Sequence, residues 1–301
     1  MLADVARTVA AAALGRDPGP LAAVDSLSHH VFLGADVVVK VIDADRHTRL
    51  GREIALAPHL PAALTAPLLA SGVHGSGPRA VRYACYGRVP GKAPGMGLPG
   101  VDAATARRWA GQAVERLGRL HAWTPPPSVH TVLRQVLDHG GFSGRAALRA
   151  DLDRLAALDR GVPGRVLDGV ARIAAKAPAY APVTVPVHAD CHWGNWLVRD
   201  RDVTALLDFE WARLGAPVDD WFFLARFSGP HAGVVLDVVS AATGTPVDVL
   251  RGECELREAA YLLSDLLVAW EGPDGARMAA ERLRALQDLT IGRYWWRPAV
   301  S

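Results

Sequence analysis

The sequence of 301 residues predicts an α+β fold with two lobes, a small β-rich N-terminal lobe over residues 1–89 and a larger, mostly α-helical C-terminal lobe over residues 90–301. Segments rich in β-branched residues concentrate before residue 90, whereas apolar residues recur at helical spacing after it. A hydrophobic content of 50% provides enough apolar side chains for a core in each lobe. We therefore expect a folded chain with a strand-rich unit followed by a helical one.

The N-terminal lobe is expected to contain a helix followed by strands. The Ala-rich start, MLADVARTVAAAALGRD, has an early Asp and scattered Arg residues, so it predicts a helix and not a signal peptide. Residues 28–42 contain two β-branched runs around the turn GAD, which is typical of a β-hairpin. Residues 47–60 have a helical pattern, and AVRYACYGRV at residues 80–89 predicts a strand that ends at a Pro-Gly hinge.

The C-terminal lobe is predicted to be helical except around residues 183–207. Asp102 is placed to cap a long helix that runs through Ala122, because apolar residues follow it at helical spacing. Within residues 183–207 two strands bracket the polar run VHADCHWGNWLV, and a second hairpin, WLVRDRDVTALLD, turns at residues 199–202. The polar run is therefore expected to lie between strands that are anchored in the core.

Charge and composition exclude several classes of function. The formal net charge is +2, with 33 basic and 31 acidic residues, which gives no electrostatic footprint for nucleic acid or for an anionic membrane surface. No apolar segment approaches the ~18 to 20 residues that are needed to span a bilayer. The three cysteines lie far apart without a CxxC pair, as expected in a reducing compartment. We therefore expect a cytoplasmic protein whose partners are small molecules.

The polar run contains the spacing of a phosphoryl-transfer site. His188, Asp190 and Asn195 form H-x-D-x-x-x-x-N, and Asp208 begins the triplet DFE at the far end of the second hairpin. In protein kinases an Asp in such a loop accepts the proton of the substrate hydroxyl, and the following Asn and a downstream Asp bind Mg²⁺. Because Mg²⁺ prefers oxygen ligands, the hairpin is expected to bring Asn195 and Asp208 together for this purpose.

A lysine and a glutamate upstream complete this pattern. VVVK places Lys40 on a predicted strand, and Glu53 follows on the predicted helix. A lysine ammonium that a helix carboxylate holds in place can act as a fixed charge on the α and β phosphates of a nucleotide. Either residue alone is as compatible with a surface salt bridge. Five polar positions in the expected order and in the expected elements indicate a kinase site.

On these motifs the chain resembles the aminoglycoside phosphotransferases and related small-molecule kinases, which share a bilobal, protein-kinase-like fold. HADCHWGN is similar to the family's H-G-D-x-x-x-x-N, with Ala189 in place of the glycine, and DFE is similar to D-F/W-D/E. RVPG after the hinge strand, LGRLHA near residue 120 and GAPVDDWFFLA resemble further family segments in the same order. The resemblance spans most of the chain and indicates the superfamily, not the substrate.

The resemblance implies catalytic and metal-binding roles for three residues of the motifs. Asp190 would be the catalytic base, and Asn195 and Asp208 would bind Mg²⁺. The reaction that it implies is transfer of the γ-phosphoryl group of ATP or GTP to a hydroxyl group of a small molecule. The acceptor would be an antibiotic, aminoglycoside-like or another natural product.

The resemblance also implies a nucleotide site in the N-terminal lobe. Lys40, positioned by Glu53, would contact the phosphates, and the backbone from Gly87 to Val89 would hold the base. The Gly-rich loop of protein kinases, G-x-G-x-x-G, does not precede the lysine. Ser28 and the two histidines after it occupy the phosphate-loop position instead, in which the chain is more similar to antibiotic kinases than to protein kinases.

Carboxylates and aromatic residues near the C-terminus are candidates for the acceptor site. A cationic acceptor would favour a cleft lined by carboxylates, and Glu258 and Asp265 lie a heptad apart on one face of a predicted helix. Tyr261 and Trp270 would suit the face of a sugar or a nucleoside equally well. Solvated helix faces carry such charges routinely, so the sequence does not choose among acceptors.

Three alternatives to an antibiotic kinase remain open from the sequence. A housekeeping kinase of choline, homoserine or a sugar would carry the same motifs. A catalytically silent kinase-like protein would bind nucleotide or a partner without transfer, although all five polar positions are retained. A metal-dependent hydrolase would hold Zn, Mn or Fe through His188 and His192 of H-x-D-x-H, which leaves the lysine, the glutamate and DFE without a role.

Several polar and aromatic residues have simpler structural explanations. His188 is expected to hold the loop backbone by hydrogen bonds, and Cys191 is expected to be an inert packing residue. One of Asp219 and Asp220, beside the helix WFFLARF, is expected to cap the region of the motif loop. The aromatic run YWW at residues 294–296 is expected to pack in the core or between the lobes.

Overall fold

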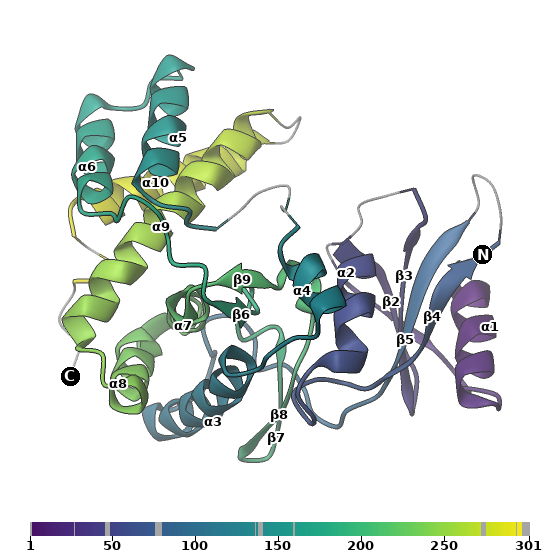
Figure 1. Ribbon diagram of the computed structural model, residues 1–301. Coiled ribbons are helices and arrows are strands. Elements are labelled where there is room, and N and C mark those ends of the chain that lie inside the picture. The colour runs from purple at the N-terminus through teal and green to yellow at the C-terminus, as the bar shows by residue number, and fades with distance from the viewer. Residues whose placement is uncertain are drawn as a thin grey trace.

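The chain folds into a strand-rich N-terminal lobe and a larger helix-rich C-terminal lobe, which lie side by side (Figure 1). This arrangement confirms the two-lobed α+β fold that the sequence predicts. The computed structural model describes residues 2–26, 28–45, 49–75, 80–135, 137, 141–158, 160–271, 275–292 and 294–296.

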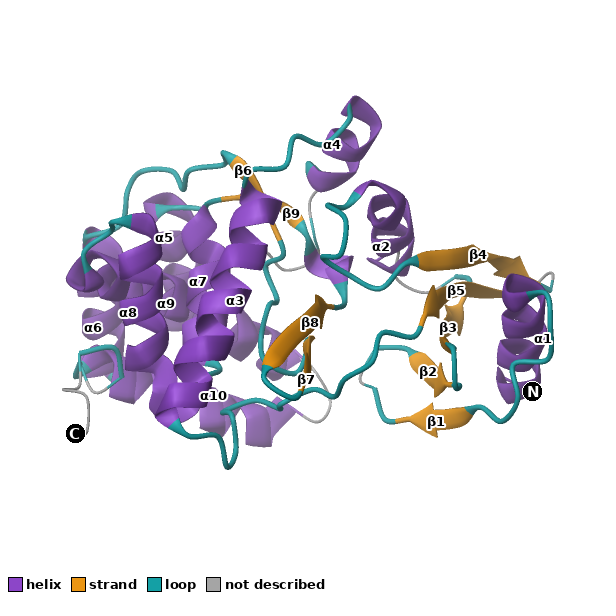
Figure 2. Cartoon of the chain, turned by 90° about the horizontal axis from the view of Figure 1, so that it is seen from below, coloured by secondary structure: helices purple, strands orange, loops and turns teal. Residues whose placement is uncertain are grey.

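The N-terminal lobe is built on one antiparallel sheet whose five strands run in the order β1-β2-β3-β5-β4. The strands are β1 (Ala22–Val24), β2 (His30–Leu33), β3 (Val37–Asp43), β4 (Leu68–His74) and β5 (Val81–Gly87). β2 and β3 form the predicted hairpin, and β5 is the predicted hinge strand. Figure 2 shows α1 (Leu2–Leu14) beside this sheet, at the end of the molecule away from the C-terminal lobe.

Alternation along β3 decides the side of the sheet to which Lys40 belongs. Val37, Val39 and Val41 are buried in a cluster with residues of α1. Because successive side chains of a strand lie on opposite faces, Lys40 lies on the face away from α1. That face carries α2 (Arg49–Leu56), which contains Glu53. The strand period therefore brings the predicted lysine and glutamate to one side of the sheet.

Helix α2 is shorter than the helix predicted over residues 47–60. It ends at Leu56 and continues as a short 3-10 helix, Ala57–His59. Pro58 lies in that 3-10 turn and lacks the N–H that would continue the α-helical hydrogen bonds. Residues 46–48 lie outside the described residues, so the predicted start of the helix is not described.

Helices make up most of the C-terminal lobe. They are α3 (Ala103–His121), α4 (Pro127–Leu133), α5 (Arg145–Ala157), α6 (Gly164–Ala175), α7 (Pro217–Arg226), α8 (Ala232–Thr243), α9 (Val247–Glu271) and α10 (Gly275–Thr290). Asp102 caps α3 as predicted, because its carboxylate accepts a hydrogen bond from the backbone N–H of Thr105 at 2.7 Å. A 3-10 helix, Gly229–His231, precedes α8.

Two short antiparallel ribbons interrupt the helices where the sequence predicts strands. β6 (Val185–Val187) pairs with β9 (Arg213–Gly215), and β7 (Trp196–Arg199) pairs with β8 (Asp202–Leu206). The predicted second hairpin is therefore present. A 3-10 helix, Phe209–Trp211, follows it and contains most of the DFE triplet.

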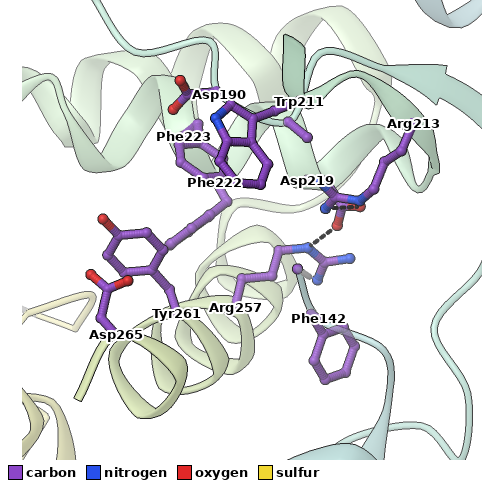
Figure 3. A pocket seen from close by; sticks show the side chains of 12 residues that line it. Phe142, Asp190, Trp211, Arg213, Asp219, Phe222, Phe223, Arg257, Tyr261 and Asp265 are labelled. Atoms are coloured by element: carbon purple, nitrogen blue, oxygen red, sulfur yellow. Dashed lines mark hydrogen bonds and ion pairs between the residues drawn. The ribbon is translucent and has the colours of Figure 1, made fainter. Parts of the chain in front are cut away.

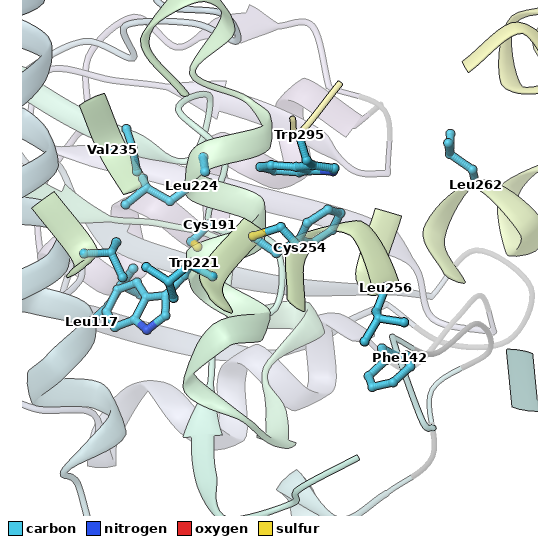
Figure 4. Close-up of a cluster of buried hydrophobic side chains, with 14 of the residues drawn as sticks. Leu117, Phe142, Cys191, Trp221, Leu224, Val235, Cys254, Leu256, Leu262 and Trp295 are labelled. Carbon is cyan, nitrogen blue, oxygen red and sulfur yellow. The ribbon is translucent and has the colours of Figure 1, made fainter. Parts of the chain in front are cut away.

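One large apolar core holds the C-terminal lobe together, and the motif loop is anchored in it. Figure 4 shows Leu117 of α3, Trp221 of α7 and Cys254 of α9 near the side chain of Cys191. Cys191 is fully buried, as predicted for a packing cysteine. Of the C-terminal aromatic run, Trp295 is buried in the same core, whereas Tyr294 and Trp296 are exposed, so the predicted core packing holds for Trp295 alone. The loop that carries the motif therefore has a fixed base in the core.

The described residues contain no single helix that is both long enough and apolar enough to cross a membrane. One pair of segments, Gly229–Thr243 and Val247–Trp270, passes that test only when taken together, and it is bent by 118°. α8 and α9 both contribute side chains to the apolar core.

Candidate active site

The motif loop, residues 188–195, connects β6 to β7 and holds Asp190 by short hydrogen bonds. The side-chain amide of Asn195 donates to the backbone oxygen of Asp190 at 2.8 Å and to its carboxylate Oδ2 at 3.2 Å. The backbone N–H of Leu207 donates to the backbone oxygen of Asn195 at 2.8 Å. The hairpin thus brings Asn195 next to the residue that precedes Asp208.

A buried carboxylate beneath the loop fixes the loop backbone. Asp220, in the first turn of α7, is fully buried and accepts hydrogen bonds from the backbone N–H groups of His188 at 3.1 Å and Ala189 at 2.7 Å. His121 of α3 donates to the same carboxylate at 2.8 Å. Ala189 has a φ of 63°, a left-handed conformation that is costly for a residue with a Cβ atom. The sequence predicts that either Asp219 or Asp220 caps the loop, and the structure shows that Asp220 does so.

We expect Asp220→Asn to lower the free energy of unfolding by about 3 kcal/mol, because it removes one partner from a buried charged network. Burial alone would raise the pKa of Asp220, but the hydrogen bond and charge of His121 and the loop N–H groups outweigh it and lower that pKa. A carboxyl whose pKa is lower in the folded than in the unfolded state stabilises the fold at pH values above its unfolded-state pKa, about 3.9. This stabilisation is lost as the pH falls through the folded-state pKa.

Urea unfolding followed from neutral to acidic pH measures both effects. The wild-type protein should lose stability below about pH 4, and the variant should show a weaker loss over the same range. Asp237→Asn is the matched control, because Asp237 is exposed on α8 and its ion pair with Arg107 spans 3.7 Å. Equal unfolding free energies for wild type and Asp220→Asn at neutral pH would contradict the assignment.

His188 uses both ring nitrogens to hold backbone groups. Its Nε2 donates to the backbone oxygen of Leu207 at 2.9 Å, and its Nδ1 accepts from the backbone N–H of Asp190 at 3.2 Å. Burial lowers the pKa of His188, which favours this neutral form. In the described part of the chain, no group of three or more His, Cys, Asp or Glu residues is placed to hold a metal ion. Because both ring nitrogens of His188 hold backbone groups, its position does not support the hydrolase alternative.

The predicted lysine, glutamate and DFE aspartate meet between the lobes. The Nζ atom of Lys40 lies 2.7 Å from Oε2 of Glu53 and 2.7 Å from Oδ1 of Asp208. Arg52 of α2 is buried and donates to the backbone oxygen of Ala212 at 2.9 Å, which ties α2 to the segment after DFE. Three residues that are far apart in the sequence thus form one charged cluster.

The charges around this cluster favour a cation. Burial and the neighbouring charge of Asp208 raise the pKa of Asp190 to about 8. Burial and the same neighbour raise the pKa of Glu210 to about 7. Burial would also raise the pKa of Asp208, but the Lys40 ammonium outweighs it and lowers that pKa. The carboxylates therefore repel one another, and the cations beside them are Lys40 and Arg49, whose Nε atom lies 3.9 Å from Oε2 of Glu210.

The segment at the phosphate-loop position reaches the DFE triplet in this structure. The hydroxyl of Ser28 donates to Oε1 of Glu210 at 3.2 Å, and Nε2 of His29 lies 3.4 Å from Oε2 of the same carboxylate. His29 is buried, whereas His30 begins β2 and is exposed. Ser28 is therefore on the cleft side of the N-terminal lobe, close to the residues that follow Asp208.

The hinge segment continues from β5 into the C-terminal lobe. The N–H of Gly87 donates to the backbone oxygen of Pro67 at 2.8 Å, and Val89 packs against the cluster that contains Tyr86. The chain then pairs with β7, because Lys92 and Val198 exchange backbone hydrogen bonds at 2.9 Å. The chain thus passes from the end of β5 to a backbone pairing with β7 within a few residues of Pro90.

A pocket of about 160 Å³ opens beside Asp190 (Figure 3). Aromatic rings form much of its wall, and they belong to Phe142, Trp211, Phe222, Phe223 and Tyr261. Its charged lining residues are Asp190, Arg213, Asp219, Arg257 and Asp265. In Figure 3 Asp190 lies at one end of the pocket, and the linked side chains of Arg213, Asp219 and Arg257 lie beyond the aromatic rings.

The predicted acceptor residues occupy different places. Asp265 lines the pocket and accepts a hydrogen bond from Nε of Arg282 at 2.9 Å. Glu258 is 2% exposed and is paired with Nε of Arg226 at 2.8 and 3.0 Å. Trp270 packs against the apolar core and is not among the residues that line the pocket. Of the three candidates, the structure brings only Asp265 to the pocket.

Arg257 lines the pocket and was not among the residues that the sequence suggested, and Tyr261 was named only as a general candidate. Both lie on the face of α9 that carries Asp265, at intervals of four residues. Residues four apart on a helix share a face, so this spacing was the available signal. Glu258, a heptad before Asp265, lies outside this row and does not line the pocket.

Comparisons with known proteins agree with the geometry. The model of the phosphotransferase enzyme family matches residues 23–256. The chain is similar to the GDP complex of aminoglycoside 2'-phosphotransferase-IIIa, at 18% identity and a TM-score of 0.73, over 95% of this chain and 98% of that one. It is also similar to macrolide 2'-phosphotransferase from Brachybacterium faecium, at 23% identity and a TM-score of 0.64, over 93% and 98% of the two chains.

A third similar structure is a thermostable mutant of an aminoglycoside phosphotransferase in a ternary complex with AMP-PNP and hygromycin B. It shares 15% identity with this chain at a TM-score of 0.64, over 96% of this chain and 98% of that one. No curated protein sequence matches the chain. The structural similarities confirm the predicted protein-kinase-like fold.

Proposed function

The chain belongs to the phosphotransferase enzyme family, and on this basis we propose that it transfers the γ-phosphoryl group of ATP or GTP to a hydroxyl group of a small molecule. The observation that carries the proposal is the position of Asp190. Its side chain lines the pocket, and its pKa is raised by burial and by the charge of Asp208, which is paired with Lys40. One carboxylate therefore lies between a pocket for an acceptor and a charged cluster for phosphates.

In this proposal Asp190 is the catalytic base. A base must lie within hydrogen-bond reach of the hydroxyl that it deprotonates, and Asp190 is the carboxylate at the end of the pocket nearest the motif loop. The amide of Asn195 orients its Oδ2. Burial and then repulsion from Asp208 raise the pKa of Asp190, and a bound cation would relieve the repulsion.

Asp208 and Asn195 are the proposed ligands of Mg²⁺. A carboxylate and an amide oxygen are the oxygen donors that this ion prefers, and the surplus of carboxylates around Lys40 gives the site a negative potential. When bound, the ion would neutralise charge on the β and γ phosphates. The chain's own part is to hold the two donors on neighbouring ends of the β7-β8 hairpin.

The proposed nucleotide site lies between lobes that we divide at residues 1–89 and 90–301. Lys40, held by Glu53, would contact the phosphates, and the segment around Ser28 would cover them. The backbone of the hinge, from Gly87 to Val89, would hold the base. We place the protein in the cytoplasm, where nucleotide is available and the three buried cysteines remain reduced.

Mass spectrometry of acceptor panels tests the proposal. Aminoglycosides, macrolides, peptide and nucleoside antibiotics, choline, homoserine and sugars are each incubated with the enzyme, Mg²⁺ and ATP or GTP. A gain of one phosphoryl group on a compound, absent with Asp190→Asn, would establish the reaction and separate an antibiotic kinase from a metabolite kinase. Mg²⁺-dependent nucleotide binding without transfer to any compound would favour a silent binding protein, and no nucleotide binding would refute the kinase proposal.

A further inference from the structure

The carboxylates of the pocket beside Asp190 are already neutralised by arginines. Oδ1 of Asp219 accepts from Nε of Arg257 at 2.6 Å, and its Oδ2 lies 3.4 Å from Nη2 of Arg213. Asp265 is paired with Arg282 at 2.9 Å. Among the described lining residues, Asp190 is the one carboxylate for which no pairing with an arginine is found. A positively charged acceptor would therefore meet few free negative charges here.

The aromatic walls are also occupied by cations. Guanidinium groups lie over three of the rings that line the pocket, at 4.4 Å from the ring centre for Arg49 over Trp211 and at 5.1 Å for Arg257 over Phe142. Tyr261 has two such neighbours, which are Arg226 at 4.4 Å and Arg282 at 5.7 Å. A ring whose π-electrons already attract a guanidinium offers less to an ammonium group of a ligand.

Arg257 is buried and is held by two ion pairs. It is 3% exposed, and its Nε and Nη1 atoms bind Asp219 and Glu253, each at 2.6 Å. Its Nη2 atom is buried and has no hydrogen-bond partner among the described residues. Because this atom is closed off from solvent, Arg257 acts at the pocket through its charge and its ion pair with Asp219, not through a free donor. In Figure 3 the guanidinium group of Arg257 lies on the side of the pocket away from Asp190, next to Asp219.

We propose that the acceptor is a hydroxylated, ring-containing molecule without net positive charge, held by the aromatic walls of the pocket. This inference rests on the proposed function, in which the pocket receives the acceptor, and it names the class of acceptor. Arg257 and Arg282 determine the preference by neutralising Asp219 and Asp265. An ammonium-rich acceptor is disfavoured by the arginines at the pocket.

A matched series of three probes tests the charge preference. Nitrophenyl glucoside is neutral, nitrophenyl glucosaminide with its amine free is a cation at mildly acidic pH, and nitrophenyl glucuronide is an anion. Ligand-observed NMR titration without nucleotide gives a Kd for each probe. The wild-type protein should bind the neutral probe about tenfold more tightly than the cation, the order of magnitude of one charge interaction at a partly buried site. Tighter binding of the cation than of the neutral probe would overturn the proposal.

Two variants test the role of the arginines. Arg257→Gln leaves Asp219 with Arg213 alone, and Arg282→Gln leaves Asp265 unpaired. Each variant should strengthen binding of the cationic probe relative to the neutral probe by about tenfold. Arg282 is the more exposed of the two, so its variant provides a test if the Arg257 variant does not fold. Arg251→Gln, also on α9 but outside the pocket lining, should leave the ratio unchanged.

The remaining outcomes are also decisive. If the ratio of the Kd values for the neutral and cationic probes stays at the wild-type value in both folded variants, the role of the arginines is refuted. Failure of all three probes to bind the wild-type protein would refute recognition of a ring-containing sugar in this pocket. Calorimetry of MgATP and MgGTP binding on the same preparations keeps the two proposals apart. Absence of nucleotide binding would count against the proposed function, whereas the probe ratios are measured without nucleotide.

Discussion

Replacing Asp190 with asparagine is expected to lower kcat by about 10² to 10⁴-fold, the range for loss of a positioned general base. Asparagine has the same shape and can keep the contact with Asn195, but it cannot take up the proton of the acceptor hydroxyl. Because the base acts in the transition state and not in nucleotide binding, the affinity for MgATP should stay within about twofold of the wild-type value.

Steady-state kinetics on the acceptor found by mass spectrometry, together with calorimetry of MgATP, measure this effect. Asp200→Asn is the matched control, because it makes the same chemical change at the exposed turn between β7 and β8. Asp200 has a φ of 56° there. The control should have wild-type kcat. Full activity of Asp190→Asn would remove the residue from the role of base.

Asp208→Ala should abolish the Mg²⁺-dependent part of nucleotide binding, a loss of about 100-fold in affinity at saturating Mg²⁺. The carboxylate is the charged member of the proposed ligand pair, and Asn195 supplies only a neutral amide oxygen. The same substitution leaves Lys40 paired with Glu53 alone, at 2.7 Å, so a phosphate contact through Lys40 can persist without the metal.

Calorimetry of ATP binding, with and without Mg²⁺, separates these contributions. Asp208 has a φ of 70°, and alanine is strained in this left-handed conformation, whereas asparagine tolerates it better. Asp208→Asn is therefore measured beside Asp208→Ala to exclude an effect of the backbone. An unchanged MgATP affinity in both variants would show that the metal assignment is wrong.

The sequence predicted the lobes and the motif loop because those segments carry local signals. β-Branched runs around a turn define β2 and β3, and the helical spacing after Asp102 defines α3. β4 was not predicted. Its sequence LLASGVH has small residues in place of a β-branched run, and alternate residues along it are exposed at the edge of the sheet. An edge strand with one partner needs fewer strand-favouring residues than a central one.

The acceptor pocket was less predictable because it depends on pairings between distant residues. Glu258 and Asp265 are both acidic residues of α9, and nothing in the local pattern distinguishes them. Arg226, 32 residues before Glu258, turns that glutamate into a buried ion-pair partner. Arg257 likewise depends on Asp219 of α7 for its position. Local periodicity identifies the face of a helix, whereas the partner across the fold decides which side chain remains available.

The ion pairs of Lys40 also bear on how measured nucleotide affinities are interpreted. In this structure the lysine of the N-terminal lobe is bonded to Asp208 of the C-terminal lobe at 2.7 Å. In the proposed roles, Lys40 gives up its contact with Asp208 when it contacts the phosphate of a metal-bound nucleotide. Nucleotide binding therefore replaces one ion pair of Lys40 with another. The observed Kd would then report the difference between two sets of contacts and would understate the strength of the lysine-phosphate contact itself.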